Sequence, residues 1–338
     1  MRTRAIYGCS GRTLTAPEQA FFEEAKPWGF ILFARNVVDR DQLTSLTRAL
    51  RETVDDSSAP ILIDQEGGRV ARLKPPQWLE RPPASTFGAM YLENQESARE
   101  AVYLNARLIA DDLEKAGINV NCAPLLDVPV AGADAVIGDR AFGSDPAAVI
   151  DLGRAFIEGL LEGGVLPIMK HVPGHGRAFT DSHRDLPRIA TEAAELSATD
   201  FVTFRSLNHC PMAMTAHVVY EAIDSNRPAT TSPKVIRDVI RGEIGFEGIL
   251  ISDDISMGAL SGPISTRTKA ALFAGCDIVL HCNGSMAEMQ EVAEEARPLE
   301  GAVLRRADHV LSQLSRAAPL ERGAAEARLR ELLGDRHD

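Results

Sequence analysis

Long hydrophobic runs are missing from this sequence of 338 residues, and so is an excess of basic charge. No apolar stretch approaches the roughly 18 residues of a membrane-spanning helix, and no hydrophobic segment follows a basic start. The net charge of −12, with no basic run, argues against a general nucleic-acid-binding protein. We therefore expect a soluble protein that binds neither membrane nor nucleic acid.

Cysteine is also sparse, and the known cofactor-binding loops are absent. The five cysteines are scattered and odd in number, which is typical of reduced core residues rather than of a disulfide framework. No GxGxxG motif or P-loop follows any predicted strand. The sequence therefore predicts a cytoplasmic location and no nucleotide cofactor.

Short apolar runs recur along the chain, and helical patterns separate them. Each run has the length of a buried strand, and most are followed by polar or charged residues. The predicted strands cover Arg4–Cys9, Gly29–Phe33, Pro60–Ile63, Ile118–Leu126, Val165–Met169, Met212–Thr215, Gly248–Ile251 and Asp277–Leu280. Helices are predicted at about 15–24, 41–54, 96–116, 197–207 and 266–274, with others starting at Asp145-Pro146 and Ser232-Pro233.

Eight alternating units of strand and helix predict a parallel sheet closed into a (β/α)8 barrel of the TIM type. A doubly wound open sheet is the competing fold. We expect one catalytic domain over residues 1–338, with C-terminal helices from about 285, and a monomer. The Ala-, Glu- and Arg-rich tail from Glu321 is predicted to be a solvated helix.

The stretch from Val165 to Pro187 carries an unusual amount of ionisable chemistry. Its strand ends in Lys170-His171, a Pro-Gly-His-Gly turn contains His175, and the loop continues to Asp181 and His183. In a barrel the polar residues after the strands meet at one face, where active sites lie. The candidate set at that face is Asp64, Arg72, Arg140, Lys170, His171, His175, Asp181, His183, Asp253 and Asp254.

The pair Asp253-Asp254 contains the best candidate for a nucleophile. A carboxylate held at a strand end can attack the anomeric carbon of a sugar and form a glycosyl-enzyme intermediate. One of the two can instead cap the following turn, and the pair alone does not say which.

The histidines allow two interpretations. His183 can act as general acid and then base, with Asp181 fixing its tautomer. His171, His175 and His183 can alternatively bind a metal with Asp64 or Asp253, although the sequence has no HExxH motif. Lys170, Arg72 and Arg140 are interpreted as hydrogen-bond donors to a polyhydroxylated or partly anionic ligand. The alternative is that they form ion pairs with the many acidic residues of the chain.

Several segments together resemble those of the glycoside hydrolase family 3 β-N-acetylglucosaminidases. They are ILFARN, DQEGGRVARL, APLLDV, IGDRAF, KHVPGHG followed by four residues and DSH, and ILISDDISM, in that order. Val172 stands where the family usually has Phe. The likeness spans about Gly29 to Met257.

The resemblance implies that Asp253 is the nucleophile, that His183 is the acid/base and that Asp181 supports it. It also implies that Asp64, Arg72, Arg140, Lys170 and His171 hold the sugar's hydroxyls. No metal or cofactor is expected. The implied reaction removes terminal β-linked N-acetylglucosamine, with retention, from N-acetylglucosaminyl-anhydromuramyl peptides of peptidoglycan recycling. Aromatic residues make up only 5% of the chain, which favours a small terminal sugar over an extended polysaccharide.

Two other functions are compatible with the same residues. A glycoside phosphorylase would deliver phosphate instead of water to the same intermediate. A non-catalytic saccharide-binding barrel would bind the sugar without turnover.

Overall fold

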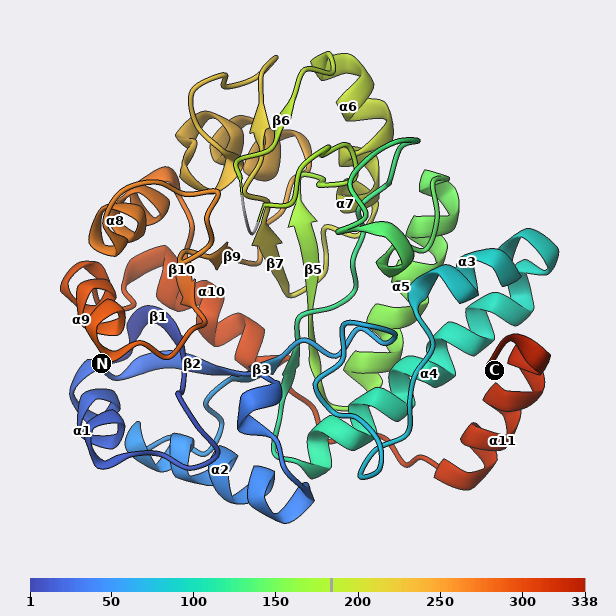
Figure 1. Cartoon of the computed structure of the whole chain (residues 1–338), viewed down its shortest axis with the longest axis horizontal. Helices are drawn as coiled ribbons and strands as arrows, with labels where there is room; N and C mark the ends of the chain where they lie inside the picture. The colour runs from blue at the N-terminus through green and yellow to red at the C-terminus, as the bar shows by residue number, and fades with distance from the viewer. Residues whose placement is uncertain (183–184, 338) are drawn as a thin grey trace.

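The computed structural model describes residues 1–182 and 185–337, and eight of its strands form a closed parallel barrel with helices around it (Figure 1). The order around the barrel is β1-β10-β9-β7-β5-β4-β3-β2, and pairing of β1 with both β10 and β2 closes it. The barrel strands are β1 (Thr3–Gly8), β2 (Pro27–Leu32), β3 (Ile61–Ile63), β4 (Val120–Asn121), β5 (Leu166–Val172), β7 (Met212–Thr215), β9 (Ile249–Asp254) and β10 (Ile278–His281).

Each predicted strand corresponds to one of these strands, and the predicted barrel is confirmed. The competing open sheet is excluded because the strands close on themselves. A small parallel pair, β6 (Arg188–Ile189) with β8 (Val219–Tyr220), lies outside the barrel and was not predicted.

The helices surround the barrel (Figure 1). They are α1 (Ala16–Ala25), α2 (Arg40–Thr53), α3 (Ala84–Glu93), α4 (Gln95–Lys115), α5 (Pro146–Glu162), α6 (Ala193–Thr199), α7 (Phe201–Ser206), α8 (Ile264–Ala274), α9 (Met286–Glu295), α10 (Gly301–Ser312) and α11 (Arg322–Leu333). A π-type helix covers Val235–Glu243, and short 3₁₀ turns cover Ala34–Asn36, Gly138–Arg140, Ala229–Thr231 and Gly334–His337. None of the described helices combines the length and the apolar character that a membrane crossing requires.

Two helix predictions need correction. The helix expected at 197–207 begins earlier and is divided into α6 and α7. The tail is helical as predicted, but α11 is not simply solvated, because Ala325, Leu329 and Leu333 are buried in the core. In Figure 1, α11 lies beside α4. Arg322 of α11 forms ion pairs with Asp111 and Asp112 of α4.

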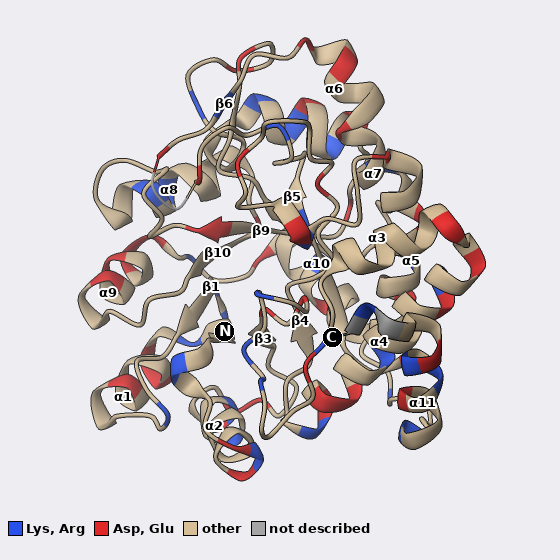
Figure 2. Cartoon of the chain, turned by 45° about the vertical axis from the view of Figure 1, so that its right-hand side comes forward, with Lys and Arg blue, Asp and Glu red and all other residues tan. Residues whose placement is uncertain are grey.

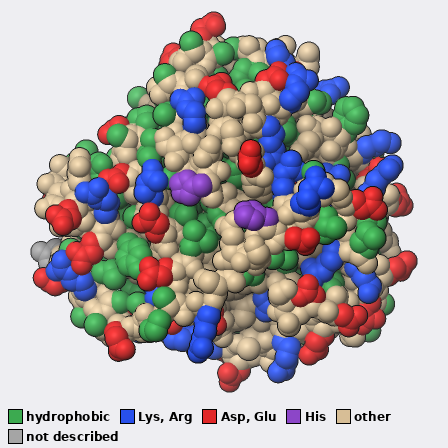
Figure 3. Space-filling view, turned by 180° about the vertical axis from the view of Figure 1, so that it is seen from behind, with side chains coloured by type: hydrophobic (Ala, Val, Ile, Leu, Met, Phe, Trp, Pro, Cys, Tyr) green, Lys and Arg blue, Asp and Glu red, His purple; other side chains and the backbone are tan. Residues whose placement is uncertain are grey.

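Alternation along the strands divides the core into two layers. In β10, Ile278 and Leu280 belong to the cluster inside the barrel, whereas Val279 belongs to the layer between barrel and helices. Strands that are covered on both faces need apolar residues on both, which explains the continuous apolar runs in the sequence. Many Lys, Arg, Asp and Glu residues lie on the outer helices (Figure 2), and side chains of both signs are interspersed over the face seen in Figure 3.

Candidate active site

A cavity of about 400 Å³ lies at the carboxyl ends of the barrel strands. All eight strands are parallel, so the residues that follow them meet at one rim of the barrel. The cavity is lined by seven of the eight residues to which the sequence assigns a role, namely Asp64, Arg72, Arg140, Lys170, His171, Asp181 and Asp253. The eighth, His183, lies outside the described residues.

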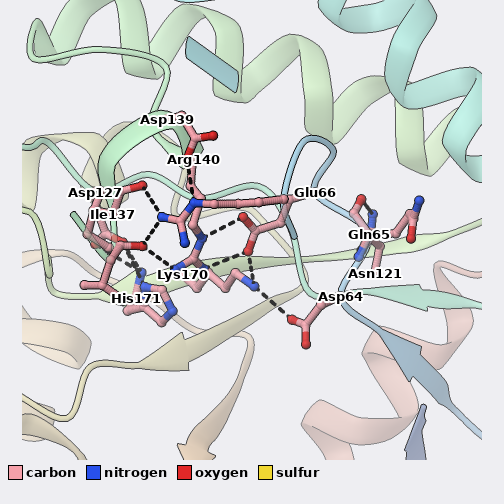
Figure 4. Close-up of polar contacts among 12 residues, drawn as sticks. Asp64, Gln65, Glu66, Asn121, Asp127, Ile137, Asp139, Arg140, Lys170 and His171 are labelled. Carbon is pink, nitrogen blue, oxygen red and sulfur yellow. Dashed lines mark hydrogen bonds and ion pairs between the residues drawn. The ribbon is translucent and has the colours of Figure 1, made fainter. Parts of the chain in front are cut away.

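Lys170 is the centre of a buried network of charges (Figure 4). Its Nζ lies 3.0 Å from Asp64 Oδ1 and 2.6 Å from Glu66 Oε1, although only 2% of the residue is exposed. Ile168 of the same strand points into the barrel, and the alternation of β5 directs Lys170 to the same side. The amine therefore enters the cavity from within the barrel wall.

Two arginines complete the network. Arg72 donates from a terminal nitrogen to Asp64 Oδ2 at 3.0 Å. Arg140 binds both oxygens of Glu66, with distances of 2.9 and 2.8 Å, in the paired geometry that suits guanidinium and carboxylate. Three cations thus share two carboxylates, so the network carries excess positive charge on the wall of the cavity.

The network keeps both carboxylates ionised. Burial by itself would raise the pKa of Asp64, but Lys170 and Arg72 outweigh burial and leave that pKa far below its usual value. For Glu66, Lys170 and Arg140 likewise outweigh burial and lower the pKa to about 2. Lys170 loses stability as a cation through burial, yet the two carboxylates raise its pKa above the ordinary value. Asp64, Glu66 and Lys170 are therefore charged at neutral pH.

Asp127 is a third carboxylate at the site, fully buried, and it supports the start of the loop after β5. Its Oδ2 lies 2.8 Å from His171 Nδ1, and its Oδ1 accepts a hydrogen bond from the backbone N–H of His175 at 2.6 Å. Burial opposes its ionisation, but the two histidines outweigh burial and lower its pKa. Since an ionised carboxylate can only accept a hydrogen bond, Nδ1 of His171 carries the hydrogen and donates it to Asp127, and Nε2 of His171 remains available to the cavity.

The two aspartates at the end of β9 have different surroundings. Asp254 accepts hydrogen bonds from Ser256 N–H at 3.0 Å, Ser256 O–H at 2.6 Å and Cys282 N–H at 3.2 Å, and so holds the following turn. Asp253 Oδ1 accepts a hydrogen bond from the backbone N–H of Asp254 at 2.8 Å. Both aspartates line the cavity, so the difference between them is the set of hydrogen bonds that ties Asp254 to the turn. The bonding thus identifies Asp254 as the turn-holding member of the pair.

His217 supports the end of β9 through a hydrogen bond to its backbone. Its Nε2 lies 3.0 Å from the carbonyl oxygen of Asp254, and its Nδ1 lies 2.7 Å from Thr230 Oγ1. The side chain is fully buried, and burial lowers the pKa of His217 despite the neighbouring Asp253 and Asp254. A neutral imidazole therefore fixes the backbone beside the candidate nucleophile.

Glu66 and Asp127 are the site residues that sequence reasoning missed. Both follow predicted strands, as do the residues that were selected. The available signal was their position, because Glu66 stands two residues after Asp64 and Asp127 is the fifth residue of the APLLDV segment. Nothing local in the sequence shows which residues they bind. Lys170 lies about a hundred residues from its partner Glu66, and His171 lies about forty residues from its partner Asp127.

A metal centre finds no support among the residues that the structure describes. Within 1–182 and 185–337, no three His, Cys, Asp or Glu side chains are grouped to hold a metal ion. His171 is bound to Asp127, and His175 Nε2 lies 3.1 Å from Ser182 Oγ. The metal interpretation that includes His183 involves a residue outside the described part.

Comparison with known proteins identifies the class of protein that this barrel and cavity form. The sequence profile described as "Glycosyl hydrolase family 3 N terminal domain" matches residues 16–313. A β-hexosaminidase of Alkalilimnicola ehrlichii is 40% identical over 285 residues, which cover 82% of this chain and 80% of that protein. A β-hexosaminidase of Stenotrophomonas maltophilia is 35% identical over 303 residues, covering 88% and 89%.

A solved structure agrees with these relatives. NagZ from Neisseria gonorrhoeae in complex with N-trifluoroacetyl-D-glucosamine matches with a TM-score of 0.88 at 30% identity, covering 98% of each chain. This chain is thus a glycoside hydrolase of the β-N-acetylhexosaminidase type. It belongs to glycosyl hydrolase family 3, as the sequence resemblance predicted.

Proposed function

We propose that this enzyme is a retaining exo-β-N-acetylglucosaminidase that acts on peptidoglycan fragments. The observation that carries the proposal is the position of Asp253, which lines the same cavity as the Lys170 network. A nucleophilic carboxylate opposite a wall of fixed donors is what a double displacement on a sugar ring requires. The gonococcal NagZ supports the sugar class, because its ligand, N-trifluoroacetyl-D-glucosamine, is an N-acylated glucosamine derivative.

In the first step Asp253 attacks the anomeric carbon and a glycosyl ester forms. The bond from that carbon to the leaving oxygen breaks, and His183 gives its proton to that oxygen. In the second step His183 takes a proton from water, the water oxygen attacks the same carbon, and Asp253 is released. Asp181 supports His183 in both steps.

The sugar's hydroxyl groups are held by the charged network in this proposal. Asp64 accepts hydrogen bonds from hydroxyls, and Arg72, Arg140, Lys170 and His171 fix the position of that carboxylate or bind the sugar themselves. Each of these side chains already has a charged partner in the structure. Arg72 and Lys170 pair with Asp64, Arg140 pairs with Glu66, and His171 pairs with Asp127, so little reorganisation accompanies binding. A cavity of about 400 Å³ suits one terminal sugar unit better than an extended chain.

The substrate is proposed to be N-acetylglucosaminyl-anhydromuramyl peptide, and the enzyme is proposed to act in the cytoplasm as one catalytic barrel domain over residues 1–338. The resemblance to the family enzymes of peptidoglycan recycling supports both the substrate and the location. Free cysteines throughout the described chain are compatible with a reducing compartment.

Proton NMR of the reaction, followed in time, tests the stereochemistry and the acceptor together. The first-formed sugar should be the β-anomer of N-acetylglucosamine, in buffer with or without phosphate. First release of the α-anomer would contradict the double displacement, and a phosphate-dependent sugar phosphate product would indicate the phosphorylase instead. The same assay with N-acetylglucosaminyl-anhydromuramyl tripeptide and with N,N′-diacetylchitobiose tests the aglycone, and faster turnover of the tripeptide is expected.

A further inference from the structure

Ser182 stands between Asp181 and His183 in the chain and is held at two points. Its Oγ lies 3.1 Å from Nε2 of His175, and its carbonyl oxygen accepts a hydrogen bond from the backbone N–H of Ala259 at 3.2 Å. Only 4% of Ser182 and 3% of His175 are exposed. A side-chain bond between two buried groups is not weakened by competing water.

The first support, His175, is itself immobilised. Its backbone N–H donates to Asp127 Oδ1, and the hydroxyl of Tyr220 donates to the carbonyl of the preceding Gly174. The next residue, Gly176, packs so closely on Val128 that an added Cβ would lie 2.0 Å from the Val128 carbonyl oxygen. The imidazole of His175 is therefore a fixed point of the barrel rather than a part of a moving loop.

The second support belongs to the segment that follows the candidate nucleophile. Ala259 lies five residues after Asp254, and Leu260 N–H bonds back to Met257 in the same turn. Met257 and Asp253 both line the cavity. Ser182 thus joins the loop after β5 to the loop after β9.

Among the described residues, Ser182 is the only hydrogen-bond partner of the His175 ring. Its other nitrogen, Nδ1, is buried and has no hydrogen-bond partner within that part of the chain. Burial and the neighbouring His171 lower the pKa of His175 to about 4, so the ring is neutral at pH 7. A neutral ring can either donate to the serine hydroxyl or accept from it, and both arrangements hold Ser182 in place.

We propose that Ser182 is a positioning residue that, through its bonds to His175 and Ala259, holds Asp181 at the cavity. Asp181 is the preceding residue in the chain and lines the cavity, so anchoring Ser182 restrains the carboxylate that supports the acid/base in the proposed reaction. This inference rests on the proposed function, because it concerns the proton donor of that reaction. Replacing a residue that acts in this way should lower kcat/KM most for substrates whose leaving group needs protonation.

The test compares Ser182→Ala with the wild type on two substrates of different leaving-group ability. N,N′-diacetylchitobiose needs a proton on its leaving oxygen, whereas 2,4-dinitrophenyl β-N-acetylglucosaminide does not. Loss of the hydroxyl should lower kcat/KM about tenfold on the disaccharide and less than about twofold on the dinitrophenyl substrate. The value of kcat/KM is used because it reports the step in which the leaving oxygen departs.

A matched variant separates this role from a structural one. His175→Gln retains an amide group that can bond to Ser182, so its ratio of disaccharide to dinitrophenyl activity should stay within about threefold of the wild-type ratio. His175→Ala has no such group, so its ratio should fall as much as the ratio for Ser182→Ala. Equal losses of Ser182→Ala on both substrates, or no loss on either, would overturn the inference. Absence of turnover by the wild type itself would instead overturn the proposed function.

Discussion

At the scale of single residues, Lys170 determines the charge balance of the cavity. It is almost fully buried and bonds to both Asp64 and Glu66, and Glu66 in turn binds Arg140. Breaking one member of such a network leaves a buried charge without its partner, which costs far more than the net value of the pair. We therefore expect the carboxylates to stabilise the fold as well as to line the site.

Glu66→Gln should reveal this cost. The variant leaves Lys170 and Arg140 with one carboxylate fewer, so we expect the free energy of unfolding to fall by about 3 kcal/mol in urea denaturation at pH 7. Asp238→Asn is the control, because Asp238 pairs with Arg237 on the exposed surface and its loss should not change the urea midpoint. Equal midpoints for Glu66→Gln and the wild type would show that the network does not stabilise the fold.

His175 should make stability fall in mild acid. Its pKa is about 4 in the fold, against about 6.5 for an ordinary histidine. Between these values the unfolded chain takes up a proton that the folded chain excludes, so the free energy of unfolding decreases as pH falls from about 6.5 to 4. From pH 7 to pH 5 this contribution amounts to about 2 kcal/mol.

His175→Gln should remove that contribution and make the loss of stability between pH 7 and pH 5 smaller than in the wild type. Urea unfolding of both proteins at the two pH values measures it. The same slope in both would show that His175 is not the group that takes up the proton.

The sequence identified the polar residues that follow strands, because the barrel brings all strand ends to one face. Asp64, Lys170 and Asp253 could be selected in this way. Their partners could not be predicted, because nothing in the sequence distinguishes Glu66 and Asp127 from exposed acidic residues. Only the fold shows that they lie beside Lys170 and His171. The sequence left open which of Asp253 and Asp254 holds the following turn, and the hydrogen bonds of Asp254 answer that question.

At the scale of elements, the start of the loop after β5 depends on close backbone packing. Gly176 lies against Val128, and a Cβ there would meet the carbonyl carbon at 2.3 Å as well as the oxygen. Backbone atoms cannot move aside as a flexible side chain can. The glycines of the PGHG turn were correctly placed in a loop from the sequence, but this contact depends on the distant Val128 and could not be predicted.

Gly176→Ala should therefore displace His175 and its support of Ser182. We expect kcat/KM to fall at least about tenfold and stability to fall by about 1–3 kcal/mol, because the backbone must shift to admit the methyl group. Gly323→Ala in α11 is the matched control, since nothing lies within 4 Å of an added Cβ there. The control should keep full activity, and an active Gly176→Ala would contradict the account of this loop.

At the scale of the whole molecule, α11 attaches to the barrel's helical layer through α4. Leu329 is 2% exposed, and Arg322 bonds to Asp111 and Asp112. The sequence predicted the helix but not its packing, because the Ala-, Glu- and Arg-rich composition also fits a solvated helix. Barrel closure, by contrast, followed from counting eight strand-and-helix units.

Leu329→Ala should destabilise the protein without altering its chemistry. Removing a buried leucine side chain should cost about 3 kcal/mol, measured by urea unfolding, while kcat/KM at 25 °C stays at the wild-type value. Arg330→Ala, whose side chain is 66% exposed, should change stability by less than about 0.5 kcal/mol. A loss of activity in folded Leu329→Ala would show that α11 influences the site.

The central claim is that Asp253 forms the covalent intermediate, and chemical trapping tests it most directly. A 5-fluoro N-acetylglucosaminyl fluoride should form a long-lived ester with the nucleophile, visible as one added sugar in the intact mass. Peptide mapping should place that sugar on Asp253, and Asp253→Asn should neither be labelled nor keep more than about a thousandth of the wild-type kcat/KM. A label on Asp254 or Asp64, or turnover by Asp253→Asn at the wild-type rate, would contradict the account.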